Sequence, residues 1–430
     1  MALNPEELKK RRQERKLQQQ QQAAARKKLL FRLAIAAAVL LTCTIVILVI
    51  TMGGKSEKEP AQTPQASVTQ PQQESPSSEP TQPQQTVIHL AAAGDLNITD
   101  QTVAAGGVAY NYTDAFMDVA HLLADADISI VNFEGGLYGD PFGTTTASAP
   151  QSMMDALAAA GVDLVQLANS YAISDGVSGL RDTINGVRLA GMEPLGVYAD
   201  QAAFQKSKGY TLQNINGITV AFVAFTKGMD GMALPSGSEK CVNVLYTDYS
   251  SSYQKVDTAG ISAIMDAAAA AKPDLTVVLV HWGSEFNDTI SSSQKKIVEL
   301  LQSKGADAII GTHSHYVQQM TLDSETGKFI AYSLGDFFGD ASRSGSEYSV
   351  VLDLEITKNH ETGVTKITNF SYTPIFTVVQ KGTPSRVVRI QEAMYAYEHL
   401  YLERIDRANY DAMAYALTRI EARIHPEDAS

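Results

Sequence analysis

The feature that most constrains the fold is a series of short apolar segments, most of which end in a polar side chain. From residue 86 onward, apolar runs typical of buried strands alternate with Ala-rich stretches typical of helices. The expected strands are 87–93, 127–133, 162–168, 218–225, 275–280 and the run that begins at 305. The expected helices are 112–124, 153–160, 179–190, 261–271 and 293–304. This alternation predicts a layered α/β architecture with long inner strands.

Polar residues with ligand chemistry recur where these strands end. They are Asp95, Glu134, Asn169, His281, and the pair His313 and His315. Ligands of open α/β sheets bind beyond the carboxyl ends of the strands, so we expect these side chains to converge. Taken singly, each has a structural interpretation: a helix cap, an Asx turn, a core-edge histidine or a solvated carboxylate. Their joint placement favours a binding site.

The two histidines that close the run starting at Gly305 are one residue apart. On an extended backbone, residues two positions apart point to the same face, so we expect both imidazoles to reach one spot. Gly311 and the small Ser314 leave room for close approach. Imidazole suits zinc, iron and manganese. The alternative is a pair of loop histidines that bind nothing.

The first 85 residues indicate an anchor and a stalk. Residues 1–32 carry ten Lys or Arg against three Glu, and residues 33–52 carry no charge, which predicts a transmembrane helix. The positive charge before this span places the N-terminus in the cytoplasm and the rest of the chain outside. A cleaved signal peptide is the alternative, but the apolar run is long and no Ala-x-Ala site follows. Residues 53–85, rich in Pro, Gln and Ser, read as a disordered stalk.

Charge and cysteine content narrow the possible functions. The whole chain carries a formal charge of −13, and residues 1–32 contribute +7, so the remainder carries about −20. Such a domain repels nucleic acid and other polyanions unless a bound cation offsets the field locally. The only two cysteines, Cys43 and Cys241, lie on opposite sides of the membrane boundary, so we expect no intrachain disulfide.

Six short motifs, taken together, resemble the CapA family of capsule and poly-γ-glutamate synthesis proteins. They are Gly94-Asp95, Asn132-Phe133-Glu134, Leu167-Ala168-Asn169, His281-Trp282-Gly283, Gly311-Thr312-His313-Ser314-His315 and Tyr332-Ser333-Leu334-Gly335-Asp336-Phe337. The resemblance spans roughly residues 87–380. It implies a calcineurin-like metallophosphoesterase fold, a β-sandwich flanked by helices. It also implies membership of a membrane-bound assembly that makes or exports an extracellular anionic polymer.

The resemblance also implies a site for two divalent metal ions, zinc, manganese or iron. By this comparison one ion is held by Asp95 and His315, the other by Asn169, His281 and His313, with Glu134 as the bridge. Paired cations of this kind clamp a phosphoryl oxygen and activate water as a nucleophile.

Four positions depart from the family pattern or bear on it. Asn97 stands where phosphoesterases of this fold often carry a histidine ligand, which puts occupancy of the first ion in doubt. Tyr171 stands in place of the expected catalytic histidine, and a phenol with an ordinary pKa near 10 is a poor general acid at neutral pH. Asp175 is matched to the Asp-x-Gly that follows in the family. Asp336 replaces a common Asn; it could recruit a harder cation or form a turn, and we favour the turn.

The C-terminal part is expected to hold an edge hairpin and a long helix. The hairpin strands are 350–356 and 364–372, residues 381–384 break the sheet, and 386–424 reads as one continuous helix. Its apolar stripe comprises Ile390, Met394, Tyr397, Tyr401 and Ile405. We expect the stripe to pack on the main domain, with docking to a membrane partner as the alternative. The domain boundaries are thus 86–380 for the phosphoesterase-like domain and 381–430 for a helical extension.

Three functions follow. The first is a single-pass membrane protein of capsule or poly-γ-glutamate biosynthesis and export, with an extracellular metal-binding domain that contacts membrane-embedded synthesis subunits and an anionic polymer. The second is an active extracellular metal-dependent hydrolase. The third is a non-catalytic scaffold that keeps the fold without the metals. Tyr171 and Asn97 favour weak or absent turnover, whereas the retained ligand-type residues favour metal binding, so we favour the first.

Overall fold

The computed structural model describes residues 84–399 and 405–426. The basic segment, the expected membrane span at 33–52 and nearly all of the stalk lie outside the described residues. Within the described ranges, no helix combines the length and the apolar character needed to cross a membrane. The chain divides into two units between Glu79 and Pro80, and the description below concerns the second.

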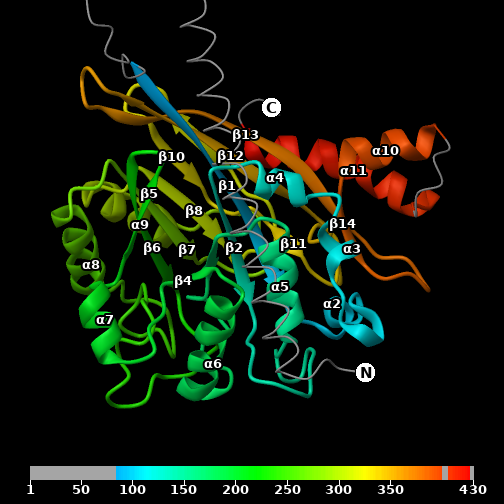
Figure 1. The fold of residues 1–430 in the computed structure, drawn as a ribbon, viewed down its shortest axis with the longest axis horizontal. Coiled ribbons are helices and arrows are strands. Elements are labelled where there is room, and N and C mark those ends of the chain that lie inside the picture. The colour runs from blue at the N-terminus through cyan, green and yellow to red at the C-terminus, as the bar shows by residue number, and fades with distance from the viewer. Residues whose placement is uncertain (1–83, 400–404, 427–430) are drawn as a thin grey trace, which may run out of the picture. The chain divides into compact units, whose positions relative to one another are not determined.

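Two mixed β-sheets form the centre of this unit (Figure 1). The first sheet has the strand order β14-β13-β12-β1-β2-β3-β4, with β11 paired to β1. Its strands are β1 (Gln85–Asn97), β2 (Ile128–Glu134), β3 (Leu164–Gln166), β4 (Glu193–Leu195), β11 (Asp336–Phe338), β12 (Tyr348–Asn359), β13 (Thr365–Val378) and β14 (Arg386–Arg389). Strands β1 to β4 run parallel, so their carboxyl ends lie at one edge of the sheet.

The second sheet has the order β5-β6-β7-β8-β10-β9. Its strands are β5 (Thr211–Ile215), β6 (Ile218–Thr226), β7 (Leu275–His281), β8 (Ala308–Thr312), β9 (Met320–Asp323) and β10 (Lys328–Ala331). Strands β6, β7, β8 and β10 are parallel. The layered α/β architecture predicted from the sequence is confirmed.

Strand β6 shows why the inner strands read as unbroken apolar runs. Val220, Phe222 and Ala224 belong to a core that contains residues of both sheets. The alternate residues, Val223 among them, belong to a second core. Successive side chains of a strand point to opposite faces of the sheet. When both faces are buried, every position is apolar, and the sequence shows an unbroken apolar run instead of an alternation of apolar and polar residues.

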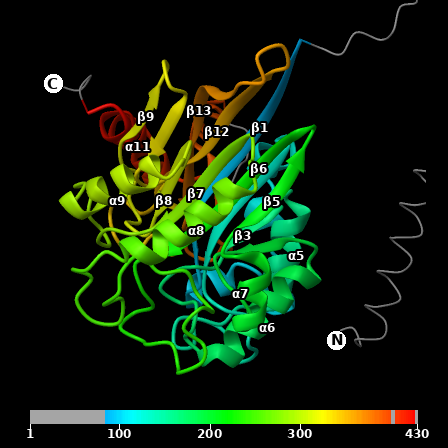
Figure 2. The ribbon, with the colours of Figure 1, turned by 90° about the vertical axis from the view of Figure 1, so that its left-hand side faces the viewer.

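Helices cover the outer faces of both sheets. On the second sheet, α8 (Thr258–Ala270) and α9 (Ser292–Ser303) supply Ile261, Met265, Ile297 and Leu301 to the second core, and Figure 2 shows them against β6 to β8. On the side of the first sheet lie α2 (Asp100–Ala104), α3 (Thr113–Phe116), α4 (Ala120–Ala124), α5 (Gln151–Ala159) and α6 (Gly176–Leu189). The 3-10 helix η1 (Gly107–Ala109) follows α2, and α7 (Gln201–Ser207) precedes β5. The prediction of a single helix over 112–124 is wrong, since residues 117–119 are not helical and separate α3 from α4.

The C-terminal part differs from the prediction in two ways. The helix expected over 386–424 is not continuous: residues 386–389 form β14, followed by α10 (Ile390–Glu398) and α11 (Arg407–Ile424). The hairpin of β12 and β13 is present, but it is not at the edge, because β12 pairs with β1 and β14 pairs with β13. Residue 380, where the boundary is expected, lies in the connection between β13 and β14 of the first sheet.

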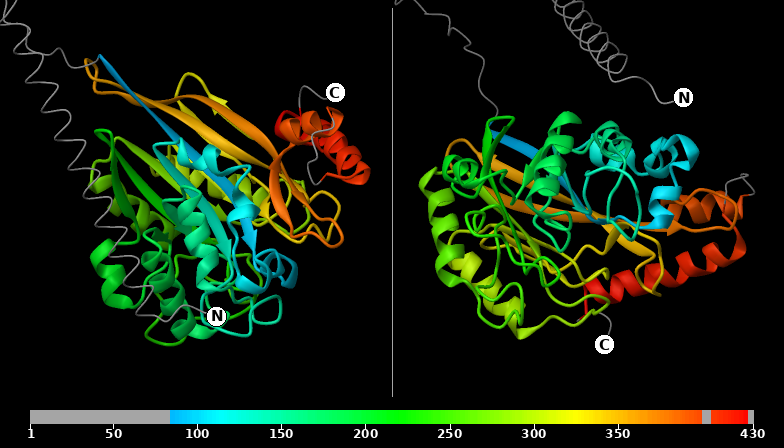
Figure 3. Two further views of the ribbon diagram at one scale, coloured as in Figure 1. Left: turned by 45° about the vertical axis from the view of Figure 1, so that its right-hand side comes forward. Right: turned by 90° about the horizontal axis from the view of Figure 1, so that it is seen from below.

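The expected apolar stripe packs on the domain as far as it is described. Ile390 and Ile405 are buried, and Met394 and Tyr397 pack partly buried against the shared core. Tyr401 lies outside the described residues. Figure 3 shows α10 and α11 beside the strands of the first sheet, and the hydroxyl of Tyr372 on β13 donates a hydrogen bond to Glu421 on α11 at 2.6 Å.

Candidate metal centre

The strand ends converge as the sequence predicts, but they form two adjacent groups of ligand atoms. The first, called the Glu134 group, contains Glu134, His281 and His313. The second, called the Asp95 group, contains Asp95, His315 and Asp336. Within each group the candidate ligand atoms lie within 4.8 Å of one another, and all six residues are buried. Strands of both sheets thus supply each group.

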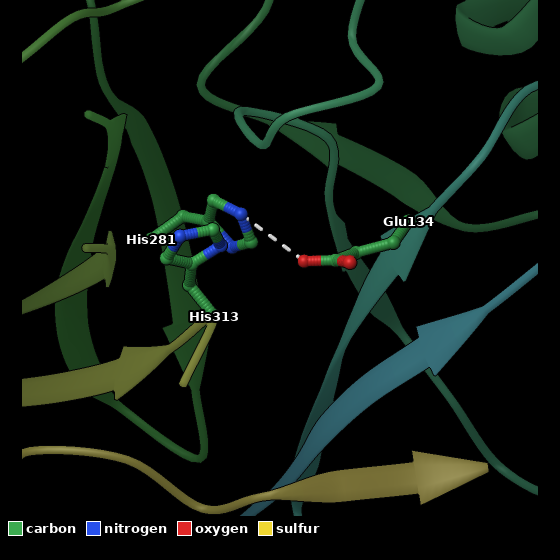
Figure 4. Close-up of side chains that lie close together, drawn as sticks. All are labelled: Glu134, His281 and His313. Atoms are coloured by element: carbon green, nitrogen blue, oxygen red, sulfur yellow. Dashed lines mark ion pairs between the residues drawn. The ribbon is translucent and has the colours of Figure 1, made fainter. Parts of the chain in front are cut away.

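The Glu134 group joins the end of β2 to the end of β7. His281 Nε2 lies 3.1 Å from Glu134 Oε1, and Figure 4 shows this carboxylate facing the two imidazoles. Two ligands held about 2.1 Å from one ion at tetrahedral or octahedral angles are separated by roughly 3.0–3.4 Å. The other ring nitrogen of His281, Nδ1, lies 3.1 Å from Thr312 Oγ1. A hydrogen bond on that side fixes the imidazole with Nε2 directed at Glu134, as in metal sites where a second residue orients the histidine.

His313 gives the strongest indication that these residues fit a cation. Its side chain is 2% exposed, its ring lies 4.4 Å from that of His281, and neither Nδ1 nor Nε2 has a hydrogen-bond partner. Buried polar atoms are nearly always paired, so such an orphan requires an explanation. Burial lowers the pKa of both His281 and His313 well below the usual value, and nearby positive charge lowers them further. Both imidazoles are therefore neutral, which is the state that binds a metal ion.

The Asp95 group is held together by charge. His315 Nδ1 lies 2.8 Å from Asp336 Oδ1 and 3.9 Å from Asp95 Oδ2. Burial alone lowers the pKa of His315, but the charge and hydrogen bond of Asp336, with Glu134 and Asp95, outweigh it and raise the pKa to about 11. Burial raises the pKa of Asp95 to about 6, and burial followed by the charge of Asp95 raises that of Glu134 well above its usual value. Closely spaced buried carboxylates resist ionisation unless a cation compensates them.

The turn favoured for Asp336 is wrong. Asp336 begins β11, is 5% exposed and pairs in parallel register with Asp95 of β1. Its carboxylate thereby lies beside that ligand and His315. The preceding chain is close as well, because the Asp95 N–H donates to the Gly335 carbonyl at 3.0 Å, and a Cβ on Gly94 would lie 1.8 Å from that oxygen. Only glycine fits at position 94.

The expectation that both histidines of the pair reach one spot is also wrong. Strand β8 ends at Thr312, and His313 and His315 have φ values of +88° and +58°. This left-handed backbone costs roughly 1–2 kcal/mol for each residue, and it turns the two rings to different groups. At Gly311 the chain itself makes the close approach, since a Cβ there would lie 2.0 Å from the Tyr332 carbonyl oxygen. Backbone strain of this kind concentrates at functional sites.

Two buried asparagines lie beside the groups, and one of them, Asn132, contacts both. Asn132 Nδ2 donates to Asp95 Oδ1 at 2.6 Å and lies 3.4 Å from His281 Nδ1. The predicted ligand Asn169 is 1% exposed and donates through Nδ2 to the Phe133 carbonyl at 2.6 Å. Its Oδ1 accepts the Tyr171 backbone N–H at 3.0 Å, and one lone pair of that oxygen remains available to a cation. The metal role of Asn169 and the bridging role of Glu134 stay predictions.

The predicted catalytic residues lie at the margin of this centre. Tyr171 is 37% exposed, and burial, followed by the charges of Glu134 and Glu285, raises the pKa of its phenol. A higher pKa makes this phenol a still weaker acid at neutral pH. Asp175 is exposed just before α6, and its side chain makes no hydrogen bond to that helix end. Asn97, the last residue of β1, is partly exposed and lies opposite Glu134 in the register.

Sequence analysis missed four residues of the centre besides Asp336. Asn132 and Thr312 contact the ligands as described, Ser170 Oγ lies 3.2 Å from His281 Nε2, and Lys227 follows the end of β6. The signal for Asn132 was its place two residues before Glu134, on the same face of the strand. The signal for Lys227 was its position directly after an apolar strand. The same kind of position identified the other candidate ligands at the strand ends.

Fold and site together define a two-sheet α/β protein with paired carboxylate and histidine groups where the strands of both sheets end. Residues 89–341 match the family described as "Bacterial capsule synthesis protein PGA_cap", and the chain belongs to this family.

Curated relatives agree with this assignment. The chain is similar to "Capsule biosynthesis protein CapA" of Bacillus anthracis, with 26% identity over 253 residues, covering 59% of this chain and 56% of the relative. It is similar to "PGA biosynthesis protein CapA" of Bacillus subtilis, with 27% identity over 51% of this chain and 52% of the relative. The chain thus matches about half the length of these relatives.

Solved structures of low sequence identity also align with the chain. The "calcineurin-like phosphoesterase YfkN" of Bacillus subtilis aligns at 15% identity and a TM-score of 0.43, covering 77% of this chain and 99% of that one. A phosphatase of Mycoplasma pneumoniae aligns at 14% identity and a TM-score of 0.43, covering 68% of this chain and 94% of that one.

Proposed function

We propose that this protein is a membrane-anchored component of capsule or poly-γ-glutamate biosynthesis and export, whose extracytoplasmic domain binds divalent cations in a metallophosphoesterase-like centre. Family membership and the names of the curated relatives support the pathway. The calcineurin-like character of the fold belongs to the same proposal. The observation that carries the metal-binding part is His313, a buried imidazole without a partner for either nitrogen, beside Glu134 and His281.

Cations held by the two groups would supply Lewis-acid polarisation of a phosphoryl oxygen. The chain's own residues prepare that site in three ways. His281 and His313 are neutral, Glu134 and Asp95 supply carboxyl oxygens as ligands, and the surrounding strands of both sheets exclude water from all of them. Turnover also needs a general acid, and Tyr171 would be a poor one because it is a phenol with a raised pKa. We therefore propose cation binding with slow or absent hydrolysis.

Elemental analysis of the purified full chain tests the metal-binding part. We expect more than one and up to two transition-metal ions per chain in the wild type and fewer than one in the variant with both His313→Ala and His315→Ala. A His89→Ala variant is the matched control, because this histidine is exposed and pairs with Asp353, which belongs to neither group of candidate ligands. Equal metal content in all three proteins would refute the assigned ligands.

An active hydrolase is the second candidate, favoured by the near-complete ligand set. Hydrolysis of p-nitrophenyl phosphate by the manganese-loaded wild type and by Tyr171→His separates the two candidates. We expect a wild-type rate near background and an increase of about 10²-fold or more in the variant, the gain typical of a restored general acid. A fast wild-type rate, abolished by His313→Ala, would instead identify an active enzyme.

The proposed topology has its own test. Trypsin added to intact cells should remove the main domain and leave residues before 33 protected, as an antibody to each end would detect. Protection of both ends in intact cells, with cleavage only after lysis, would refute an extracytoplasmic domain.

A further inference from the structure

Lys227 holds an ammonium group beside the strand end that carries His281. Its backbone N–H donates to the His281 carbonyl at 2.7 Å, and its Nζ donates to the Gly283 carbonyl at 3.1 Å. The same Nζ lies 4.9 Å from the ring centroid of Tyr253. These three contacts fix the position of the ammonium without using all of its donors, since a lysine has three N–H groups.

The charge of this ammonium is not neutralised locally. Lys227 is partly buried, and in the part of the chain that the structure describes no carboxylate lies within ion-pair distance of its Nζ. Glu285, Asp230 and Glu134 act on it only from farther away. Burial lowers the pKa of Lys227, as expected for a cation withdrawn from water. A desolvated charge without a partner is costly, so an anion is the natural complement.

The position of the charge relates it to the metal centre. The ammonium lies beside the Glu134 group, because the Lys227 backbone contacts the ligand His281 and its Nζ contacts Gly283, two residues after that ligand. A cation bound by the Glu134 group would add further positive charge to the same space. The domain as a whole is acidic, with about −20 outside the first 32 residues, so a positive group beside the centre runs against the overall charge of the domain.

We propose that Lys227 binds an oxyanion of the ligand that occupies the metal centre, and that this residue determines the preference of the site for anionic substrates. The inference rests on the proposed function, because the metal-binding groups supply the second half of the anion site. The compact, strongly hydrated ammonium suits a phosphate or carboxylate oxygen as a point charge. A phosphoryl group and a carboxylate both carry such an oxygen, and titration with a separate probe for each distinguishes between them.

Calorimetric titration of the manganese-loaded full chain with inorganic phosphate and, separately, with glutarate tests the proposal. We expect Lys227→Met to weaken binding of at least one probe by about 10- to 100-fold, the usual effect of losing a charge-assisted hydrogen bond. Loss for phosphate alone identifies a phosphoryl ligand, and loss for glutarate alone identifies a carboxylate. Lys227→Arg keeps the charge and should retain most of the affinity even where the methionine variant folds poorly.

Lys240→Met is the matched control. Its ammonium also lies over an aromatic ring, 5.6 Å from the centroid of Phe204, but it is exposed and makes no contact with the centre. This variant should bind both probes as the wild type does. Unchanged affinity for both probes in Lys227→Met, at full metal content, would overturn the role of Lys227.

Metal content measured on each protein keeps the two proposals separate. A metal-free wild type would refute the metal centre of the proposed function. In that case the titrations are repeated without metal, and the Lys227 assignment is overturned if Lys227→Met again leaves both affinities unchanged.

Discussion

Replacing His313 with leucine should change the stability of this protein in opposite directions with and without metal. In the metal-free protein, His313 buries two ring nitrogens that have no hydrogen-bond partner. A buried polar side chain left without hydrogen bonds costs about 1–3 kcal/mol, and leucine fills a similar volume without that cost. In the presence of a chelator, we therefore expect His313→Leu to raise the free energy of unfolding by about 1–3 kcal/mol.

With metal bound, the free energy of unfolding of the wild type should exceed that of His313→Leu or equal it. A cation at 100 times its dissociation constant stabilises the wild type by about 2.7 kcal/mol, and the variant lacks one ligand for it. Urea unfolding can be followed by the fluorescence of Trp282, the chain's single tryptophan, which is fully buried next to His281. The measurement is made in chelator and in manganese.

A histidine on the protein surface provides the control for this measurement. His121→Leu, on the exposed surface of α4, should shift stability by no more than about 0.5 kcal/mol in either condition. If His313→Leu is destabilised in chelator by as much as a truncated core residue, the imidazole has a structural partner and the reasoning from its orphaned nitrogens fails.

Two further predictions concern the Asp95 group. The pKa of Asp95 is raised from 3.8 to about 6 by burial, so the metal-free folded state holds this proton more tightly than the unfolded state; stability should fall as pH rises from about 4 to 6, and Asp95→Asn should remove up to about 3 kcal/mol of that fall in urea titrations with chelator. A pH slope that is unchanged in the variant would contradict this. Asp336→Asn should destabilise the metal-free protein by about 2–4 kcal/mol because it leaves the buried His315 cation unpaired, whereas Asp353→Asn, which breaks the exposed pair with His89, should cost less than about 1 kcal/mol. Equal effects of the two asparagine variants would show that burial does not set the strength of the His315 pair.

The inner strands were predictable because burial imposes a local pattern on the sequence. Strands β6, β7 and β8 are covered on both faces, which demands apolar residues at every position, and the polar residue that ends this pattern marks the strand tip. His281 and Glu134 were found in this way. The same rule, applied to β6, would have identified Lys227 as a candidate site residue at a strand end.

The remaining errors come from long-range pairing and from backbone geometry. The register of Asp336 with Asp95 joins segments far apart in the chain, and nothing in the residues around Asp336 encodes it. The assignment of His313 and His315 to different groups follows from positive φ values, which non-glycine residues adopt only when the surrounding structure holds them there. The short strand β14 was read as helix because four residues are too few to establish a period.

The two groups differ in what a cation must displace, and this difference bears on function. In the Glu134 group both imidazoles are already neutral, so a cation replaces at most the proton of the carboxyl group. In the Asp95 group, His315 carries a proton with a pKa of about 11 and pairs with Asp336, and a cation binds its ring only after that proton leaves. An ion in the Glu134 group should therefore bind more tightly than an ion in the Asp95 group at neutral pH. A centre that held one cation firmly and a second weakly, with Tyr171 in place of the histidine acid that the family resemblance implies, would be better suited to binding an anionic group than to rapid hydrolysis.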